Sequence, residues 1–415
     1  MLCRLRVRGF KSLADADVQF DRMNVIMGPN ASGKSNLLDA MKFLAGLVRG
    51  PSLREAFEMQ RGDPIEAIRR SGAEDEGGWG EFEIEADIEL TDSVVEKVER
   101  RIEELAGSVE RRKKRVTEKL LRYRVVVSVN RDTGVLRLRE ERLWAFKKGW
   151  RGKRKRRPFI ETVDGEIRLR REGQPAPPRR FKAADRSTMN FEPLHLPFYP
   201  HIIAFREELL GWKFYYFEPS AMRRPCGKVR TEEIKENGSG LAAFYWTLKR
   251  ENTGNFHLAV RQARNLIPLL EALDVVETPD GRLLLRVRQS GAWFSARVMS
   301  EGTVRVLGLL AILHSPNPPT LIGFEEPENG VHPGRLLLLS ETIRNAESFG
   351  FQFVVNTHST LFASRFGNEH LRVCRMGKDG STMFEPFQTV EALYRRNDIR
   401  KALEDAIMTG DFEGW

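Results

Sequence analysis

Residues 28–35 read GPNASGKS and match the phosphate-binding loop pattern G-x-x-x-x-G-K-[ST] at every fixed position. The apolar residues 23–27 precede this loop and are typical of a short buried strand, whereas residues 36–46 show the pattern of a helix. Backbone N–H groups of such a loop point at phosphate oxygens, and the helix directs its positive N-terminal dipole at them. The sequence therefore predicts a strand–loop–helix unit that binds ATP or GTP.

The residue types in this loop assign roles to its side chains. Lys34 is expected to reach the β- and γ-phosphates, and the hydroxyl of Ser35 is expected to help hold Mg²⁺. The predicted cofactors are therefore ATP and Mg²⁺. The predicted nucleotide-binding residues of the loop are Gly28, Pro29, Asn30, Ala31, Ser32, Gly33, Lys34, Ser35 and Asn36.

A second motif lies far downstream, where residues 320–326 form an apolar run that ends in Glu325 and Glu326. Ligands of α/β sheets bind at the carboxyl ends of the strands, so these acids are suitably placed for an active site. Glu325 is expected to hold Mg²⁺, directly or through water, and Glu326 to activate the attacking water as a general base. Another apolar run, residues 351–356, is followed by His358, which is expected to sense the γ-phosphate.

Composition limits the class of protein. The 415 residues are 41% hydrophobic, which is enough for a sizeable core, and the length suggests two or three domains. No stretch approaches the roughly 18 consecutive apolar residues of a membrane helix, so no membrane contact is expected. Cys3, Cys226 and Cys374 are far apart and form neither a disulfide framework nor a CxxC pair, which makes the reducing cytoplasm the expected compartment.

The middle of the chain has a different pattern. In the charged stretch from 93 to 124, apolar residues recur at spacings of four and three, which predicts a long amphipathic helix or a short helical hairpin with a coiled-coil seam. Residues 123–129 and 135–138 then predict a β-hairpin. We therefore expect the chain to be organised as residues 1–90, an insertion at 91–190, and residues 191–415.

The net charge of +10 is concentrated in part of this insertion. From Lys147 to Arg157 the chain reads KKGWRGKRKRR, with eight basic residues and no acidic one. Such a segment, with tryptophans interleaved, fits contact with the phosphate backbone of duplex DNA. It equally fits a solvated loop that binds nothing, and the sequence does not separate the two interpretations.

Four motifs follow one another in the chain, namely GPNASGKS at 28–35, MSEGT at 299–303, IGFEEPENGVHP at 322–333 and NTHS at 356–359. Together they resemble the ATPase heads of the ABC/SMC/RecF superclass. More narrowly they are similar to AAA_21-type ATPases, which include the ATPase portions of OLD-family nucleases and of several anti-phage systems. The resemblance implies an α/β P-loop head of the ABC-ATPase type: a mixed sheet flanked by helices, an antiparallel β region near the N-terminus, and an α+β insertion carrying a coiled-coil-like helix.

The resemblance also implies how copies of the chain assemble. Ser300, Glu301 and Gly302 correspond to the signature motif, which opens a helix and binds the γ-phosphate held by the opposite subunit. Residues 328–333 correspond to the loop that contacts the dimer partner. The implied partner is a second copy of the chain, in an ATP-dependent homodimer or a higher oligomer.

In the same family, Glu326 corresponds to the catalytic glutamate and His358 to the switch histidine. The Mg²⁺ carboxylate is Glu325, where many relatives have aspartate. The glutamine that usually touches Mg²⁺ is not assigned, and its candidates are Gln60, Gln174 and Gln289.

Only about thirty residues follow Pro386, too few for the Toprim nuclease domain of OLD nucleases, so an effector is expected on a separate polypeptide. Two classes of function stay open. In the first, the chain is a DNA-responsive ATPase that regulates or delivers a nuclease or toxin in phage defence or DNA repair. In the second, it is an ATP-dependent assembly scaffold that does not bind DNA. A transporter ATPase fits less well, because such chains are usually shorter and lack a long basic insertion.

Overall fold

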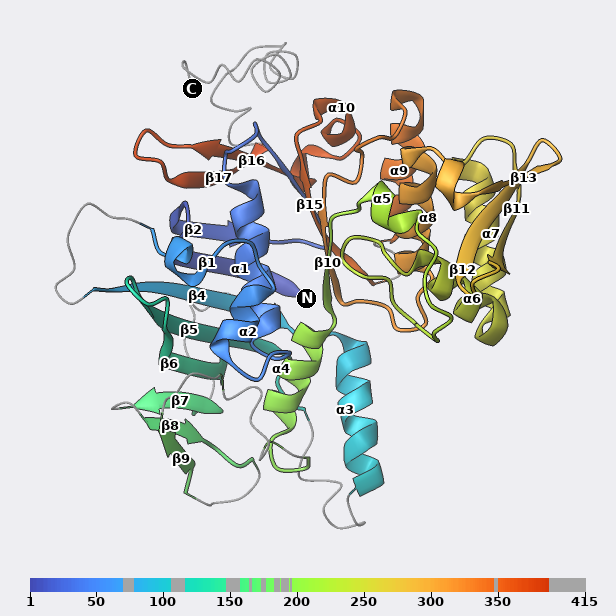
Figure 1. Cartoon of the computed structure of the whole chain (residues 1–415). Helices are drawn as coiled ribbons and strands as arrows, with labels where there is room; N and C mark the ends of the chain where they lie inside the picture. The colour runs from blue at the N-terminus through green and yellow to red at the C-terminus, as the bar shows by residue number, and fades with distance from the viewer. Residues whose placement is uncertain are drawn as a thin grey trace. The chain divides into compact units, whose positions relative to one another are not determined.

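The computed structural model of the chain describes residues 1–69, 78–105, 116–146, 157–163, 166–172, 177–182, 187, 194, 196–346 and 350–387. The chain divides into two compact units (Figure 1). The first unit consists of Met1–Asp21, Asn30–Trp212 and Cys374–Glu385, and the second consists of Arg22–Pro29, Lys213–Val373 and Pro386–Trp415.

The first unit contains an eight-stranded sheet in the order β2-β1-β4-β5-β6-β7-β8-β9 (Figure 1). Each neighbouring pair is antiparallel. The strands are β1 (Leu2–Phe10), β2 (Leu13–Gln19), β4 (Trp79–Glu89), β5 (Leu120–Asn130), β6 (Leu136–Ala145), β7 (Ile160–Val163), β8 (Glu166–Leu169) and β9 (Arg179–Lys182).

One face of this sheet is apolar and is covered by helices. Its strands alternate buried and more exposed residues, as half-buried strands do. The ring of Phe43 lies 5.3 Å from that of Phe82 on β4, and the ring of Phe205 lies 5.3 Å from that of Tyr123 on β5. The helices of the unit are α1 (Lys34–Gly46), α2 (Leu53–Glu58), η1 (Pro64–Ala67), α3 (Asp92–Leu105) and α4 (Pro200–Leu210).

The other face of the sheet carries ion pairs between neighbouring strands. Arg4 of β1 pairs with Asp17 of β2 at 2.7 Å and with Glu85 of β4 at 2.9 Å, and Arg124 of β5 pairs with Glu83 of β4 at 2.9 Å. Opposite charges on facing strands favour this register. Because these pairs are partly exposed, each contributes little to stability, on the order of 1 kcal/mol or less.

Part of the predicted insertion, residues 91–190, is described in the structure. The stretch from 93 to 124 is helical only as far as Leu105 among its described residues, and it is a strand from Leu120. The predicted hairpin is present as β5 and β6, and β5 pairs with β4 along eleven residues. Strands from 91–190 therefore extend the sheet of the N-terminal strands, and the described residues of that range belong to the first unit.

The second unit contains a parallel arrangement of buried strands. Here β3 (Met23–Met27) lies between β15 (Gln352–Thr357) and β16 (Leu371–Met376), and β14 (Leu321–Glu325) lies on the other side of β15. The full order of this sheet is β10-β14-β15-β3-β16-β17, with β10 at Trp212–Tyr215 and β17 at Thr382–Pro386. All residues of β3, β14 and β15 are buried, as expected for strands covered on both faces.

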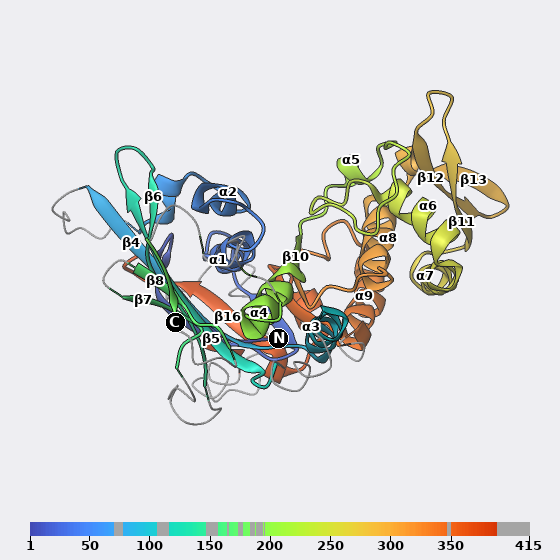
Figure 2. The ribbon, with the colours of Figure 1, turned by 90° about the horizontal axis from the view of Figure 1, so that it is seen from below.

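A separate three-stranded antiparallel sheet, β11-β12-β13, lies beside α6 and α7 in this unit (Figure 2). One core of buried residues joins the parallel strands to the helices around them. The remaining elements of the unit are α5 (Pro219–Met222), α6 (Leu241–Glu251), α7 (Thr253–Leu266), β11 (Leu270–Glu277), β12 (Leu283–Gln289), β13 (Ala292–Ser295), η3 (Ala296–Val298), α8 (Glu301–Leu313), α9 (Pro333–Ala346), α10 (Thr360–Ala363) and η5 (Asn368–His370).

No helix within the described ranges combines the length and the apolar character that crossing a bilayer requires.

Candidate functional site

Three parallel strands of the second unit end at the same edge of their sheet. Glu325, the last residue of β14, pairs with Asn356 of β15, and Asn356 pairs with Ile26 of β3. The phosphate loop begins at Gly28, directly after β3. The carboxyl ends of the strands thus bring the predicted metal carboxylate to the edge where the loop begins, which is where ligands of such sheets bind.

Glu326 directly follows β14 and has a left-handed backbone conformation, with φ of 49°. Its N–H donates to the carbonyl oxygen of Asn356 at 2.8 Å, and its carboxylate accepts a hydrogen bond of 2.5 Å from Nδ2 of Asn329. Positive φ is unusual for a residue with a side chain and is found most often at functional sites. The turn removes Glu326 from the buried face of the strand and fixes its carboxylate.

His358 lies against the same carboxylate. Its Nδ1 is 3.1 Å from Oε1 of Glu326, and both side chains are partly accessible, Glu326 at 27% and His358 at 42%. A neutral imidazole that donates from Nδ1 leaves Nε2 free to accept a hydrogen bond. The structure therefore brings together two of the predicted catalytic residues, with a carboxylate held in place and open to water.

Two buried polar residues lie beside this pair, and the sequence interpretation gave neither of them a catalytic role. Glu328 accepts a hydrogen bond from the hydroxyl of Thr357, and burial raises the pKa of its carboxyl group. The side-chain amide of Asn356 is 2% exposed, and neither its nitrogen nor its oxygen has a hydrogen-bond partner. Asn356 belongs to the NTHS motif. Its pairing with Glu325 on the neighbouring strand places it at the candidate site.

The donor types at this edge fit Mg²⁺. Glu325 offers a buried carboxylate, and the amide oxygen of Asn356 has no partner beside it. Mg²⁺ prefers oxygen ligands and is usually bound through one or two carboxylates together with substrate phosphates and water. The described residues contain no group of three or more His, Cys, Asp or Glu side chains suited to a metal.

The predicted signature residues open helix α8. Ser300 is its N-cap, and the hydroxyl oxygen of Ser300 accepts from the N–H of Thr303 at 3.2 Å. Gly302 packs against the backbone of Gly330, because a Cβ added at Gly302 would lie 2.8 Å from the carbonyl oxygen of Gly330. Ser300 is exposed, so the N-terminus of α8, with its partial positive charge, is suited to binding an anion.

In the first unit, the rest of the phosphate loop leads into α1, which begins at Lys34. Asn36 donates from Nδ2 to the hydroxyl of Ser12 at 2.7 Å, and Thr382 donates to the carbonyl oxygen of Ser32 at 3.0 Å. Ser12 and Thr382 are themselves 2.6 Å apart. These two hydroxyls hold the phosphate loop in place. Local sequence patterns did not identify Ser12 and Thr382, because both residues lie outside the loop in the sequence.

Gly33 is the tightest point of this contact. Its φ is 95°, and a Cβ added there would lie 1.9 Å from the hydroxyl oxygen of Thr382. We predict that Gly33→Ala lowers nucleotide affinity by about tenfold or more, because the loop must move and the left-handed conformation is strained by about 1–2 kcal/mol. Titration with a fluorescent ATP analogue measures the loss. Gly281→Ala is the matched control, since Gly281 has φ of 76° with nothing within 4 Å of its added Cβ. Equal affinities of the two variants would contradict the prediction.

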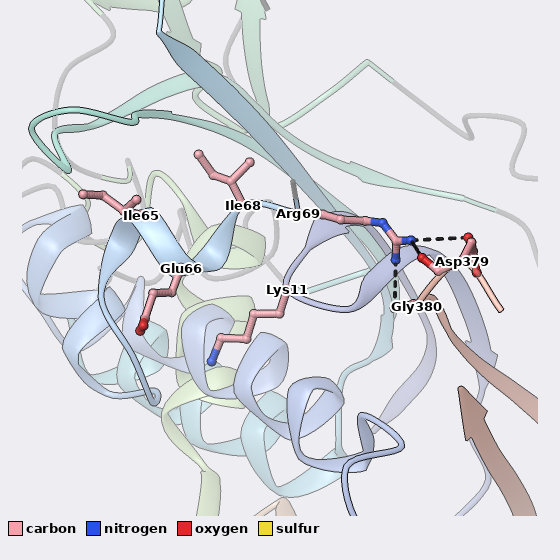
Figure 3. Close-up of a pocket in the computed structure, with 7 residues that line it drawn as sticks. All are labelled: Lys11, Ile65, Glu66, Ile68, Arg69, Asp379 and Gly380. Atoms are coloured by element: carbon pink, nitrogen blue, oxygen red, sulfur yellow. Dashed lines mark hydrogen bonds and ion pairs between the residues drawn. The ribbon is translucent and has the colours of Figure 1, made fainter. Parts of the chain in front are cut away.

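A pocket of about 400 Å³ lies in the first unit beside the turns that carry Ser12 and Thr382 (Figure 3). Arg69 crosses its rim and donates to the carbonyl oxygens of Ser12 at 3.1 Å and of Asp379 at 2.8 Å. The pocket has a volume typical of small-ligand sites and a mixed apolar and charged lining. It is lined by Lys11, Ile65, Glu66, Ile68, Arg69, Asp379 and Gly380.

The basic segment and the candidates for the Mg²⁺-contacting glutamine remain to be placed. Of the basic segment, positions 147–156 lie outside the described residues, and Arg157 is exposed. Among the glutamine candidates, Gln60 is buried in the first unit and Gln289 of β12 donates to the carbonyl oxygen of Pro268. Gln174 lies outside the described residues. The Mg²⁺-contacting glutamine therefore stays unassigned.

Comparison with known families gives a match over most of the chain. Residues 23–364 match the family model AAA_21, described as "AAA domain, putative AbiEii toxin, Type IV TA system". Among curated proteins, 57 residues are 49% identical to the chromosome partition protein Smc of Rhodopirellula baltica, and 72 residues are 42% identical to the DNA replication and repair protein RecF of Magnetococcus marinus. These matches cover 13% and 17% of this chain but only 5% and 16% of the two relatives.

Solved structures show the same fold. One is a crystal structure of an Smc head bound to the C-winged helix domain of ScpA, with a TM-score of 0.53 at 14% identity over 92% of this chain and 96% of that one. Another is the Smc head of Pyrococcus furiosus with an extended coiled coil, bound to the C-terminal domain of ScpA, with a TM-score of 0.51 at 13% identity over 94% and 98% of the two chains. The fold is therefore that of an SMC ATPase head, as the sequence motifs predicted.

Proposed function

Because the chain belongs to the AAA_21 family of ABC/SMC/RecF-superclass ATPases, we propose that it binds ATP with Mg²⁺ and hydrolyses the nucleotide. The observation that carries the proposal is the carboxylate of Glu326, held by Asn329 and His358 in a left-handed turn at the edge of the parallel strands. This geometry suits a general base that must keep one orientation and remain accessible to water.

The other motif residues have complementary roles in this proposal. Lys34 contacts the β- and γ-phosphates, and Ser35 and Glu325 hold Mg²⁺. When bound, Mg²⁺ neutralises charge on the phosphates. Glu326 takes a proton from the attacking water, and His358 holds that carboxylate through Nδ1 while its Nε2 faces the reaction.

Hydrolysis in this proposal requires a second copy of the chain. Ser300, Glu301 and Gly302 bind the γ-phosphate of a nucleotide held by the other subunit. Two observations support this step. The N-cap of α8 is exposed, and Gly302 of the same turn packs on Gly330, which lies in the predicted dimer loop at residues 328–333. An isologous dimer with two ATP molecules at the interface follows from such mutual completion.

The proposed biological role is regulation or delivery of a separate effector, a nuclease or a toxin, in the cytoplasm. The family description names a toxin of a type IV toxin–antitoxin system, and a matching relative is a DNA replication and repair protein. Both suggest a role in defence against phage or in repair. None of the three cysteines forms a disulfide bond, which suits a reducing compartment.

In the proposed role, duplex DNA binds the basic segment from Lys147 to Arg157, and the ATPase responds to the bound DNA. The quadruple variant Arg154→Glu, Lys155→Glu, Arg156→Glu and Arg157→Glu is expected to abolish DNA binding and to leave basal phosphate release unchanged. The reason is that backbone contacts rest on charge, and each lost phosphate contact lowers the salt dependence of log K by about 0.9. Fluorescence anisotropy with duplex DNA at several salt concentrations measures both.

The control exchanges lysine and arginine at the same four positions, which keeps the charge and should keep affinity without sequence preference. DNA affinity that survives the four glutamates, or that does not depend on salt, would favour the alternative function. In that alternative the chain is an ATP-dependent assembly scaffold that does not bind DNA.

A further inference from the structure

Arg305 is a buried arginine of the second unit, and two of its nitrogen atoms have no hydrogen-bond partner among the described residues. It lies on α8, five residues after the N-cap Ser300, and is 7% exposed. Its Nε and Nη1 have no hydrogen-bond partner, and no described carboxylate forms an ion pair with it. An uncompensated buried charge is costly to a fold, so a residue that keeps one usually has a use for it.

The surroundings of Arg305 connect α8 to the loop that carries the general base. A Cβ added at Gly330 would lie 2.9 Å from Cβ of Glu301 and 3.9 Å from Nε of Arg305, so the first turns of α8 pack on Gly330. Burial lowers the pKa of Arg305, although the nearby carboxylates of Glu301, Glu326 and Glu328 favour its charged form. Arg305 therefore lies among acids of this loop without bonding to any of them.

The same loop contains a carboxylate oxygen that also lacks a partner. Glu328 is 6% exposed; its Oε1 accepts from Thr357, whereas its Oε2 is buried and has no hydrogen bond. A guanidinium and a carboxylate form a strong charge-assisted bond when they meet. The loop and α8 thus each hold a buried polar group without a hydrogen-bond partner, and the two groups have opposite charges.

We propose that Arg305 is a positioning residue that transmits the state of the signature turn to Glu326 of its own chain, by pairing with Oε2 of Glu328. This inference rests on the proposed function. When Ser300 to Gly302 engage a phosphate held by a second copy, α8 moves relative to the loop, Arg305 pairs with Glu328, and residues 326–330 are fixed around the general base. In the absence of that contact the pair stays open and turnover is slow.

The test compares Arg305→Met, which removes the charge but keeps most of the length, with Arg305→Lys and with Arg344→Met, an exposed arginine of α9. Arg305→Met is expected to melt at the wild-type temperature or higher, to keep KM for ATP within about twofold, and to lose turnover by about tenfold or more. Arg305→Lys should recover part of the turnover, because it restores the charge with fewer donors. Arg344→Met should behave as wild type.

A double-mutant cycle with Glu328→Gln tests the pairing. The double variant should be no slower than the slower single variant, because residues that act as a pair are not additive. If the double variant loses turnover by the product of the two single losses, the pairing is contradicted. Turnover at the wild-type rate in Arg305→Met would contradict it as well. A fall in melting temperature that accompanies the lost turnover would show a structural role and also overturn it. If the wild-type chain releases no phosphate, the proposed function itself is contradicted. If the wild-type chain hydrolyses ATP and Arg305→Met hydrolyses it at the same rate, only the inference about Arg305 is contradicted.

Discussion

Replacing Glu326 with glutamine is expected to reduce ATP turnover by about 10²-fold or more while ATP binding is retained. The amide has nearly the shape of the carboxylate and can still engage Asn329 and His358, but it cannot take a proton from water. The loss should therefore appear in kcat and leave KM for ATP within about twofold. Phosphate release and titration with a fluorescent ATP analogue measure the two effects separately.

Glu277→Gln is the matched control, because Glu277 lies in the same unit but is half exposed and paired with Lys228. Its turnover should equal that of the wild-type chain. If Glu326→Gln hydrolyses ATP at the wild-type rate, Glu326 is not the general base. Release of phosphate that continues after Mg²⁺ is chelated would likewise remove the roles proposed for Ser35 and Glu325.

The strands that build the candidate site were predictable because their signals are local. The short apolar runs before Gly28, up to Glu325 and before His358 each stand between polar or glycine-rich flanks, and all three are strands at nearly the predicted bounds. Gly323 interrupts the apolar run, but β14 continues through it fully buried. The glycine pairs with Val354, and the neighbouring side chains provide the packing.

The domain arrangement was harder to predict, because strand pairing across long stretches of sequence leaves no local signal. The alternating pattern of β5 fits an insertion as well as it fits a continuation of the N-terminal sheet, and only its register with β4 separates the two. The apolar spacing after residue 93 fits a long helix or a short helical hairpin. The described part of that stretch is helical as far as Leu105, and β5 has begun by Leu120, where pairing with β4 determines the structure.

Polar contacts between distant segments were also beyond the sequence. Ser12 and Thr382 are separated by 370 positions and meet behind the phosphate loop. Arg305 falls within an apolar helical run. The sequence does not show that its side chain is buried with Nε and Nη1 lacking a hydrogen-bond partner, because both properties depend on how the helix packs. The motifs identified the residues expected to touch the nucleotide, whereas the residues that hold them required the structure.

Ser300→Arg is expected to abolish turnover, by about 10²-fold or more, and to leave ATP affinity within about twofold. Ser300 lies at the exposed start of α8, where a long cation would occupy the place of the phosphate bound by the other subunit. Ser300→Ala is the control. It removes the hydroxyl without adding a long cation, at a cost of about 1 kcal/mol of helix stability, and should keep far more of the turnover because Glu301 and Gly302 can still bind the phosphate. Equal losses in both variants would show that the cap, and not a shared site, explains the effect.

The most direct test of the central claim, that two copies share each site, is phosphate release by an equal mixture of Ser300→Arg and Lys34→Ala chains. Each variant alone should be inactive. In a mixed dimer, one site combines Lys34 of the first chain with Ser300 of the second and is intact. Random pairing gives half mixed dimers with one of two sites intact, so the mixture should regain turnover up to about a quarter of the wild-type value. The value is lower if Arg305 must also sense the signature turn of the hydrolysing chain, because that turn carries Ser300→Arg in the mixed dimer. A mixture that stays as inactive as its separate components would contradict the shared site.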